Sequence, residues 1–154
     1  MFLGLLALAA YFDVREYRIP NRLSLFIAAL YPVHVVASAH PVDWVGGLVV
    51  AAVTLAVLLA LYAFRAVGGG DVKLMTVTAM WAGPAAMAEF IVITTLTGGL
   101  LALLMISSAR FGFAVGFEGI GRPGTKDMLS KEALPYGVAI AAGGFFVGSQ
   151  LLIR

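Results

Sequence analysis

Apolar residues fill most of the chain in long uninterrupted runs, and short polar or glycine- and proline-containing stretches separate these runs. The run over residues 48–63 shows no alternation of apolar and polar positions, which disfavours the strands of a membrane barrel. The pattern therefore predicts an all-α fold, a polytopic integral membrane bundle of about six transmembrane helices. The expected segments are Phe2 to Arg18, Leu23 to Ser38, Trp44 to Phe64, Asp71 to Ala82, Ala85 to Ala109, and Leu134 to Ile153.

Composition supports a membrane protein and excludes several kinds of site. The chain is 62% hydrophobic and 12% charged, whereas a soluble domain carries about 25% charged residues. Its 154 residues suit a single membrane-embedded domain over residues 1–154. The absence of cysteine excludes a disulfide framework, a thiolate metal site and a cysteine nucleophile. A net charge of +2 gives no indication of a nucleic-acid partner, and no basic region precedes the first apolar run as in a signal peptide.

The basic residues predict the orientation. Nine of the ten fall in alternate connections and therefore on one side, which the positive-inside rule makes cytoplasmic. These nine are Arg15, Arg18, Arg22, Arg65, Lys73, Arg110, Arg122, Lys126 and Lys131. Only Arg154 falls on the other side, and six spans would place both termini outside.

Two aspartates, Asp13 and Asp71, stand at the edges of apolar segments on that same side. A carboxylate at membrane depth costs on the order of several kcal/mol and is a functional hypothesis by default. Helix lengths place Asp13 roughly 9 Å and Asp71 roughly 12 Å below the same surface. Two carboxyl groups that share a proton can activate water for peptide hydrolysis, so the pair predicts a cytoplasm-facing cleft with a catalytic dyad.

The neighbours of the two aspartates each allow two interpretations. Gly68, Gly69 and Gly70 lead into Asp71 as G-x-G-D; they either admit an extended substrate backbone or form an ordinary turn in which the aspartate caps a helix. Lys73 either extends to the membrane surface or tunes the dyad. Glu16 lies on the face of Asp13 and is either its hydrogen-bond partner or a charge lining the cleft.

Other residues suggest structural roles. Trp44 and Trp81 are expected at outer helix ends as interface anchors. The small residues Gly137, Ala141, Gly144 and Gly148 predict close helix packing. The histidines lack metal-ligand spacing, so no metal site is expected.

Three motifs in order resemble the prepilin peptidases, integral-membrane aspartic peptidases of the bacterial inner membrane that remove the basic leader of type IV prepilins and pseudopilins. The motifs are Asp13 followed by Ile19-Pro20-Asn21, Gly68 to Leu74, and Leu134 to Ile140. The resemblance implies that Asp13 and Asp71 are the catalytic pair and that no metal or organic cofactor takes part. It also implies a prepilin substrate within a lipid bilayer, with Pro135, Tyr136 and Gly137 among the substrate-binding candidates.

One departure narrows this resemblance. Many members carry a cytoplasmic region with paired Cys-x-x-Cys that is associated with N-methylation, and this chain has no cysteine. It is therefore similar to the short, peptidase-only type that serves tight-adherence (Flp) pili, and methyltransferase activity is not expected. The alternatives are a preflagellin or signal-peptide-peptidase-like protease, a small carrier or channel that uses the carboxylates, and a passive assembly scaffold.

Overall fold

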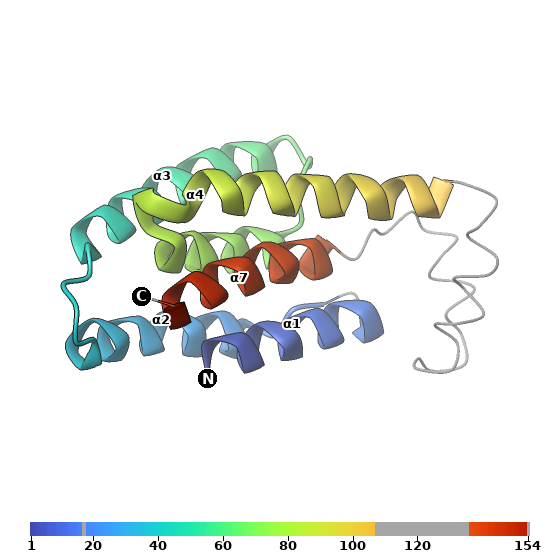
Figure 1. The fold of residues 1–154 in the computed structure, drawn as a ribbon. Coiled ribbons are helices and arrows are strands. Elements are labelled where there is room, and N and C mark those ends of the chain that lie inside the picture. The colour runs from blue at the N-terminus through green and yellow to red at the C-terminus, as the bar shows by residue number, and fades with distance from the viewer. Residues whose placement is uncertain (17, 107–135, 154) are drawn as a thin grey trace.

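The fold is all-helical in the part of the chain that the computed structural model describes, residues 1–16, 18–106 and 136–153, and no strand occurs in these ranges. The helices are α1 (Phe2–Glu16), α2 (Asn21–Ala37), α3 (Trp44–Ala63), α4 (Gly69–Ile106) and α7 (Tyr136–Ile153) (Figure 1). The prediction of an all-α fold is confirmed for these residues. By length and composition alone, α3 and residues 69–104 of α4 are apolar enough to cross a membrane, although Gly83 divides the second into two arms. The number of six spans stays a prediction.

Helix α4 consists of two arms. Gly83 has φ 57° and ψ −173°, outside the helical region, and Pro84 follows it. The positive φ suits a glycine, and proline is well placed to start the next helical arm. Figure 1 shows the chain reversing direction here, so that the two arms run side by side. The two segments predicted on either side of Gly83 and Pro84 correspond to these arms.

Helix α7 packs against both α1 and α4 (Figure 1). A Cβ atom added to Gly144 would lie 2.6 Å from Leu6 Cδ1 of α1, and one added to Gly148 would meet the Leu3 side chain. The small residues thus allow the two helices to approach closely, as their spacing predicted.

Trp81 corrects one expectation. The sequence predicted an exposed interface residue, but the Trp81 side chain is buried and only 8% exposed. Its Nε1 donates to the Ile27 carbonyl oxygen at 3.0 Å. Its ring stacks on Phe2, with centroids 4.4 Å apart, and also contacts Tyr31 and His34. The position of Trp81 at the end of an apolar segment could not show that α1 and α2 pack against its ring. Trp44, by contrast, is 52% exposed, and its place at the membrane interface stays a prediction.

Candidate active site

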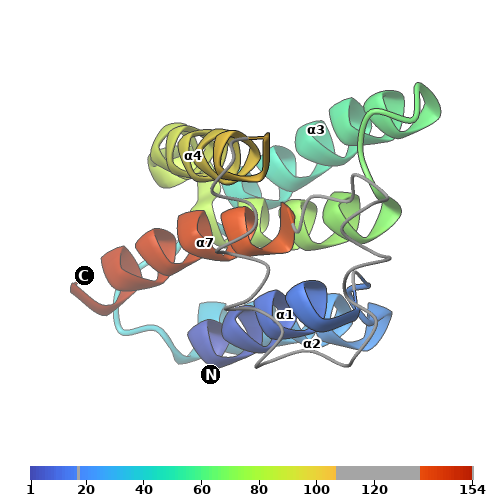
Figure 2. The same cartoon turned by 90° about the vertical axis from the view of Figure 1, so that its right-hand side faces the viewer.

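Three helix ends meet at one end of the bundle. Helix α1 ends there, and α4 and α7 begin there, on the right-hand side of Figure 1. Figure 2 looks onto this end. Asp13 lies near the end of α1, Asp71 in the first turn of α4, and Gly137 in the first turn of α7. Helix α1 ends at Glu16, two residues before the predicted Arg18.

Asp13 is buried against the start of α7. Its side chain is only 6% exposed, and its Oδ2 accepts the backbone N–H of Gly137 at 2.6 Å. A Cβ atom on Gly137 would lie 2.7 Å from that oxygen and 2.9 Å from Asp13 Cγ. The first N–H groups of a helix have no partner within it, so the Asp13 carboxylate satisfies one of them for α7. Gly137, a substrate-binding candidate from the sequence, contacts this aspartate, and its role toward substrate stays a prediction.

Asp71 occupies the third position of α4 and turns back toward the residue before the helix. Its carboxylate accepts a backbone hydrogen bond from Gly68. A Cβ atom on Gly68 would lie 3.0 Å from Asp71 Oδ2. An acidic side chain at this position that binds the N-cap backbone forms half of a capping box. The helix therefore starts at Gly69, two residues earlier than predicted.

The Asp13 and Asp71 carboxylates lie close enough to interact electrostatically. The structure thus brings together the two residues that the sequence singled out. Each carboxylate accepts a backbone N–H at a helix N-terminus, Asp13 from α7 and Asp71 from α4. The positive end of a helix dipole favours an anion. The dipole argument therefore applies to both carboxylates.

Two of the glycines before Asp71 have ordinary helical backbone. Gly69 and Gly70 belong to the first turn of α4, and Gly83 is the glycine with positive φ in the described ranges. Residues other than glycine can adopt this backbone conformation. The lack of a side chain at Gly70 lets Ile19 lie close to the helix backbone, since a Cβ atom at Gly70 would lie 3.5 Å from Ile19 Cβ.

Lys73 is exposed, and its ammonium group is bonded to a residue of another helix. Its Nζ donates to Asn21 Oδ1 at 2.9 Å. The Ile19-Pro20-Asn21 motif therefore packs against the glycine-aspartate motif, with Ile19 beside Gly70 and Asn21 bonded to Lys73. The sequence motif did not predict this contact, which joins residues far apart in the chain.

The remaining candidates differ in their surroundings. Glu16 is exposed, unlike Asp13 on the same helix. Tyr136 packs toward the second arm of α4, where a Cβ atom on Gly98 would lie 3.1 Å from its hydroxyl oxygen. Pro135 lies outside the described residues. Neither Glu16 nor Tyr136, both in the described part of the chain, forms a hydrogen bond with Asp13 or Asp71.

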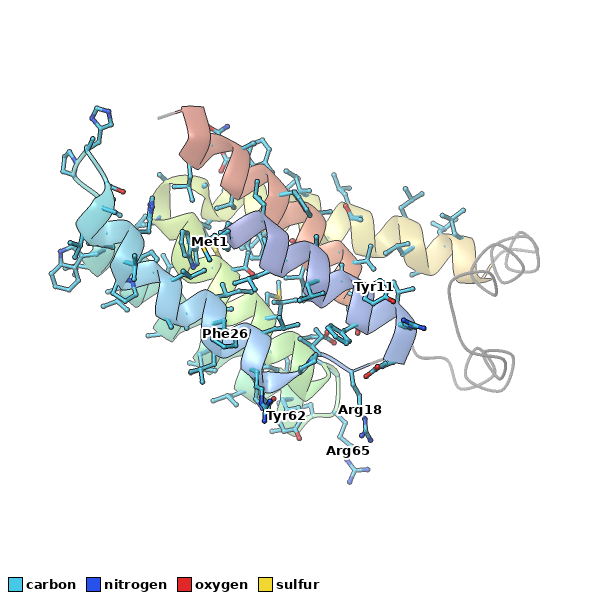
Figure 3. All side chains as sticks on the ribbon, turned by 90° about the horizontal axis from the view of Figure 1, so that it is seen from below. Met1, Tyr11, Arg18, Phe26, Tyr62 and Arg65 are labelled. Carbon is cyan, nitrogen blue, oxygen red and sulfur yellow. The ribbon has the colours of Figure 1, made fainter. Side chains whose placement is uncertain are left out.

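Acidic and basic side chains at this end of the bundle can be compared with the needs of a metal site and with the predicted charge distribution. In residues 1–16, 18–106 and 136–153, no group of three or more His, Asp or Glu side chains is placed to hold a metal ion. Two basic residues also lie at this end, and the side of the membrane that it faces stays a prediction. Figure 3 shows Arg18, from the connection between α1 and α2, and Arg65, from the connection between α3 and α4, extending away from the helices.

Comparison with known proteins places this arrangement in a family. Residues 1–103, which include both aspartates, match the model of the type IV leader peptidase family. The chain is also 28% identical over 146 residues to the prepilin leader peptidase/N-methyltransferase of Bacillus subtilis (strain 168). That alignment covers 93% of this chain and 51% of the relative, so the chain spans about half the length of this curated relative. No solved structure matches the chain. Since the family model covers well over half of the sequence, the chain belongs to the type IV leader peptidase family.

Proposed function

We propose that this protein is a membrane aspartic endopeptidase that removes the leader of a type IV prepilin or pseudopilin, with Asp13 and Asp71 as its catalytic pair. The observation that carries the proposal is the approach of these two carboxylates, from α1 and α4, in a chain of the leader peptidase family. Two carboxyl groups close to each other can share one proton, which is the starting state of an aspartic peptidase.

The proposed reaction uses the pair as acid and base. The ionised carboxylate takes a proton from a water molecule, and the resulting hydroxide attacks the scissile carbonyl carbon. The protonated carboxyl group donates a hydrogen bond to the carbonyl oxygen and then gives its proton to the departing amine. The peptide bond breaks, one water is consumed, and the pair has exchanged its proton between partners. Either aspartate can begin as the ionised one, because each accepts a helix N-terminal N–H.

The backbone contacts support this role by fixing the two carboxylates. The hydrogen bond from Gly137 occupies Oδ2 of Asp13 and leaves Oδ1 for water or substrate. The bond from Gly68 restrains Asp71 in the same manner. Gly68 is exposed and has no side chain, so an extended substrate backbone can pass beside Asp71.

The substrate class follows from the family, and a tight-adherence (Flp) prepilin is the proposed member. A prepilin from the same organism, incubated with purified full-length protein, tests this directly. Mass spectrometry should find the mature pilin and the free leader. The same spectrum, recorded with S-adenosylmethionine present, should show an unmethylated product terminus. Absence of cleavage for all prepilins of the organism would overturn the proposed function, and a methylated product would overturn the peptidase-only part.

The site is proposed to face the cytoplasm. Because the chain contains no cysteine, single introduced cysteines report the topology cleanly. Ala66, in the connection before α4, and Ala39, in the connection after α2, are both exposed. A membrane-impermeant maleimide should label Ala39→Cys in intact spheroplasts and Ala66→Cys only after permeabilisation. The reverse pattern would place the aspartates on the outer side.

A further inference from the structure

Lys73 is held by a residue of another helix. The hydrogen bond from its Nζ to Asn21 Oδ1 joins positions 52 residues apart. Lys73 lies two residues beyond Asp71, and Asn21 is the first residue of α2. The bond therefore ties the start of α2 to the start of α4.

The Asn21 side chain of α2 forms a hydrogen bond with α4 and does not cap its own helix. The N-cap position of α2 is Pro20, and no side chain caps this helix. Asparagine near a helix start commonly bonds to local backbone N–H groups. Here its carbonyl oxygen accepts from the Lys73 ammonium group of α4.

A second contact adjoins this hydrogen bond. Ile19 is 8% exposed, and a Cβ atom on Gly70 would lie 3.5 Å from Ile19 Cβ. The connection from α1 to α2 therefore lies directly on the first turn of α4. Further along, the bond from Trp81 to the Ile27 carbonyl joins the same two helices. Gly70 and Lys73 are close to Asp71 in the sequence of α4, whereas Trp81 is further along the helix. The Ile19–Gly70 contact and the Lys73–Asn21 bond are therefore the contacts with α2 and its preceding connection that lie nearest to Asp71.

We propose that Lys73 and Asn21 are positioning residues, whose hydrogen bond fixes the first turn of α4, and with it the Asp71 carboxylate, relative to Asp13. The inference rests on the proposed function, since it concerns the alignment of the catalytic pair. Asp13 is already held by α7 through Gly137, so Asp71 is the member whose alignment depends on α4. Catalytic groups must be held within about 0.5 Å of their productive geometry, and the first turn of a helix is its least restrained part.

The test measures leader cleavage by the purified full-length protein with Lys73→Met, Asn21→Leu and the double substitution. Each single substitution removes the hydrogen bond and should lower kcat by about 10- to 100-fold, the effect expected of a small misplacement, with KM little changed. The double substitution should lose no more than the larger single loss, because the same bond is removed once. Lys73→Arg and Asn21→Asp keep a donor and an acceptor and should restore most of the activity.

Arg22→Met is the matched control. Arg22 is exposed and directly follows Asn21, so this substitution removes a positive charge from the same end of the bundle without touching the bond. It should leave kcat and KM unchanged. The thermal midpoint of each variant identifies any that fails to fold, and Asn21→Leu tests the bond independently of Lys73→Met.

Several outcomes would overturn the positioning role. Unchanged kcat for Lys73→Met or for Asn21→Leu would do so, as would losses that multiply in the double substitution. A raised KM with unchanged kcat would make Lys73 a substrate ligand instead. These results presuppose cleavage by the unmodified protein and leave the proposed function intact. Absence of cleavage by the unmodified protein overturns the proposed function, and the positioning role with it.

Discussion

Replacing Gly137 with alanine tests whether the start of α7 aligns Asp13. The added Cβ would lie 2.7 Å from Asp13 Oδ2 and 2.9 Å from both Cβ and Cγ of the same residue. Comfortable separations between such atoms begin at about 3.5 Å, so the carboxylate or the helix must move by several tenths of an ångström. The 2.6 Å hydrogen bond from the Gly137 N–H would lengthen or break.

The expected loss can be estimated from that displacement. A misplacement of about 1 Å in a catalytic group costs about 100-fold in rate, which corresponds to roughly 2.7 kcal/mol of activation free energy. Gly137→Ala should therefore lower kcat for leader cleavage by on the order of 100-fold. The helix itself should tolerate the change, because alanine favours helix over glycine by about 0.5–1 kcal/mol.

Two alanine substitutions serve as controls for Gly137→Ala. In Gly144→Ala the new Cβ meets the α1 side chain of Leu6 at 2.6 Å, so it crowds the same pair of helices without touching the carboxylate. In Gly99→Ala the new Cβ meets nothing within 4 Å. Cleavage is assayed at equal protein abundance with a quantified prepilin. Equal activity of the Gly137 and Gly144 variants would refute the reasoning.

Two other substitutions follow from local geometry. Gly70→Ala should keep most activity, because its Cβ makes ordinary contact with Ile19 at 3.5 Å, whereas the branched side chain of Gly70→Val should crowd Ile19 and lose most of it. Equal cleavage by the valine variant and the unmodified protein would show that this contact does not matter. Arg65, two residues after the end of α3, has φ 58°, so Arg65→Gly should relieve about 1 kcal/mol of strain and raise the thermal midpoint by about 2–4 °C. A lower midpoint in the same detergent would show that the arginine side chain stabilises the fold.

The sequence could identify those residues whose role is visible from their immediate neighbours in the chain. Asp13 and Asp71 stood out because a charge in an apolar segment is costly, and the break in α4 was evident from Gly83 and Pro84. Length and charge distribution then placed both aspartates at one end, and the helix ends do meet there (Figure 1).

The contacts that complete the site have no local signal. Gly137 and Asp13 are 124 residues apart, and Lys73 and Asn21 are 52 apart. A glycine that donates its backbone N–H and a lysine that bonds to an asparagine look the same in sequence as residues of a turn or a surface. Trp81 was misplaced for the same reason, since its burial depends on α1 and α2 packing around it. Tertiary packing decided these roles.

The central claim is that Asp13 and Asp71 together carry out the cleavage, and the most direct test is the activity of Asp13→Asn and Asp71→Asn. Asparagine has the same shape and can still accept the backbone N–H of Gly137 or Gly68 through its amide oxygen, so both variants should fold with unchanged thermal midpoints. Neither can act as an acid or base, so purified protein of either variant should produce no mature pilin above the background without enzyme. Substantial cleavage by either folded variant would contradict the account.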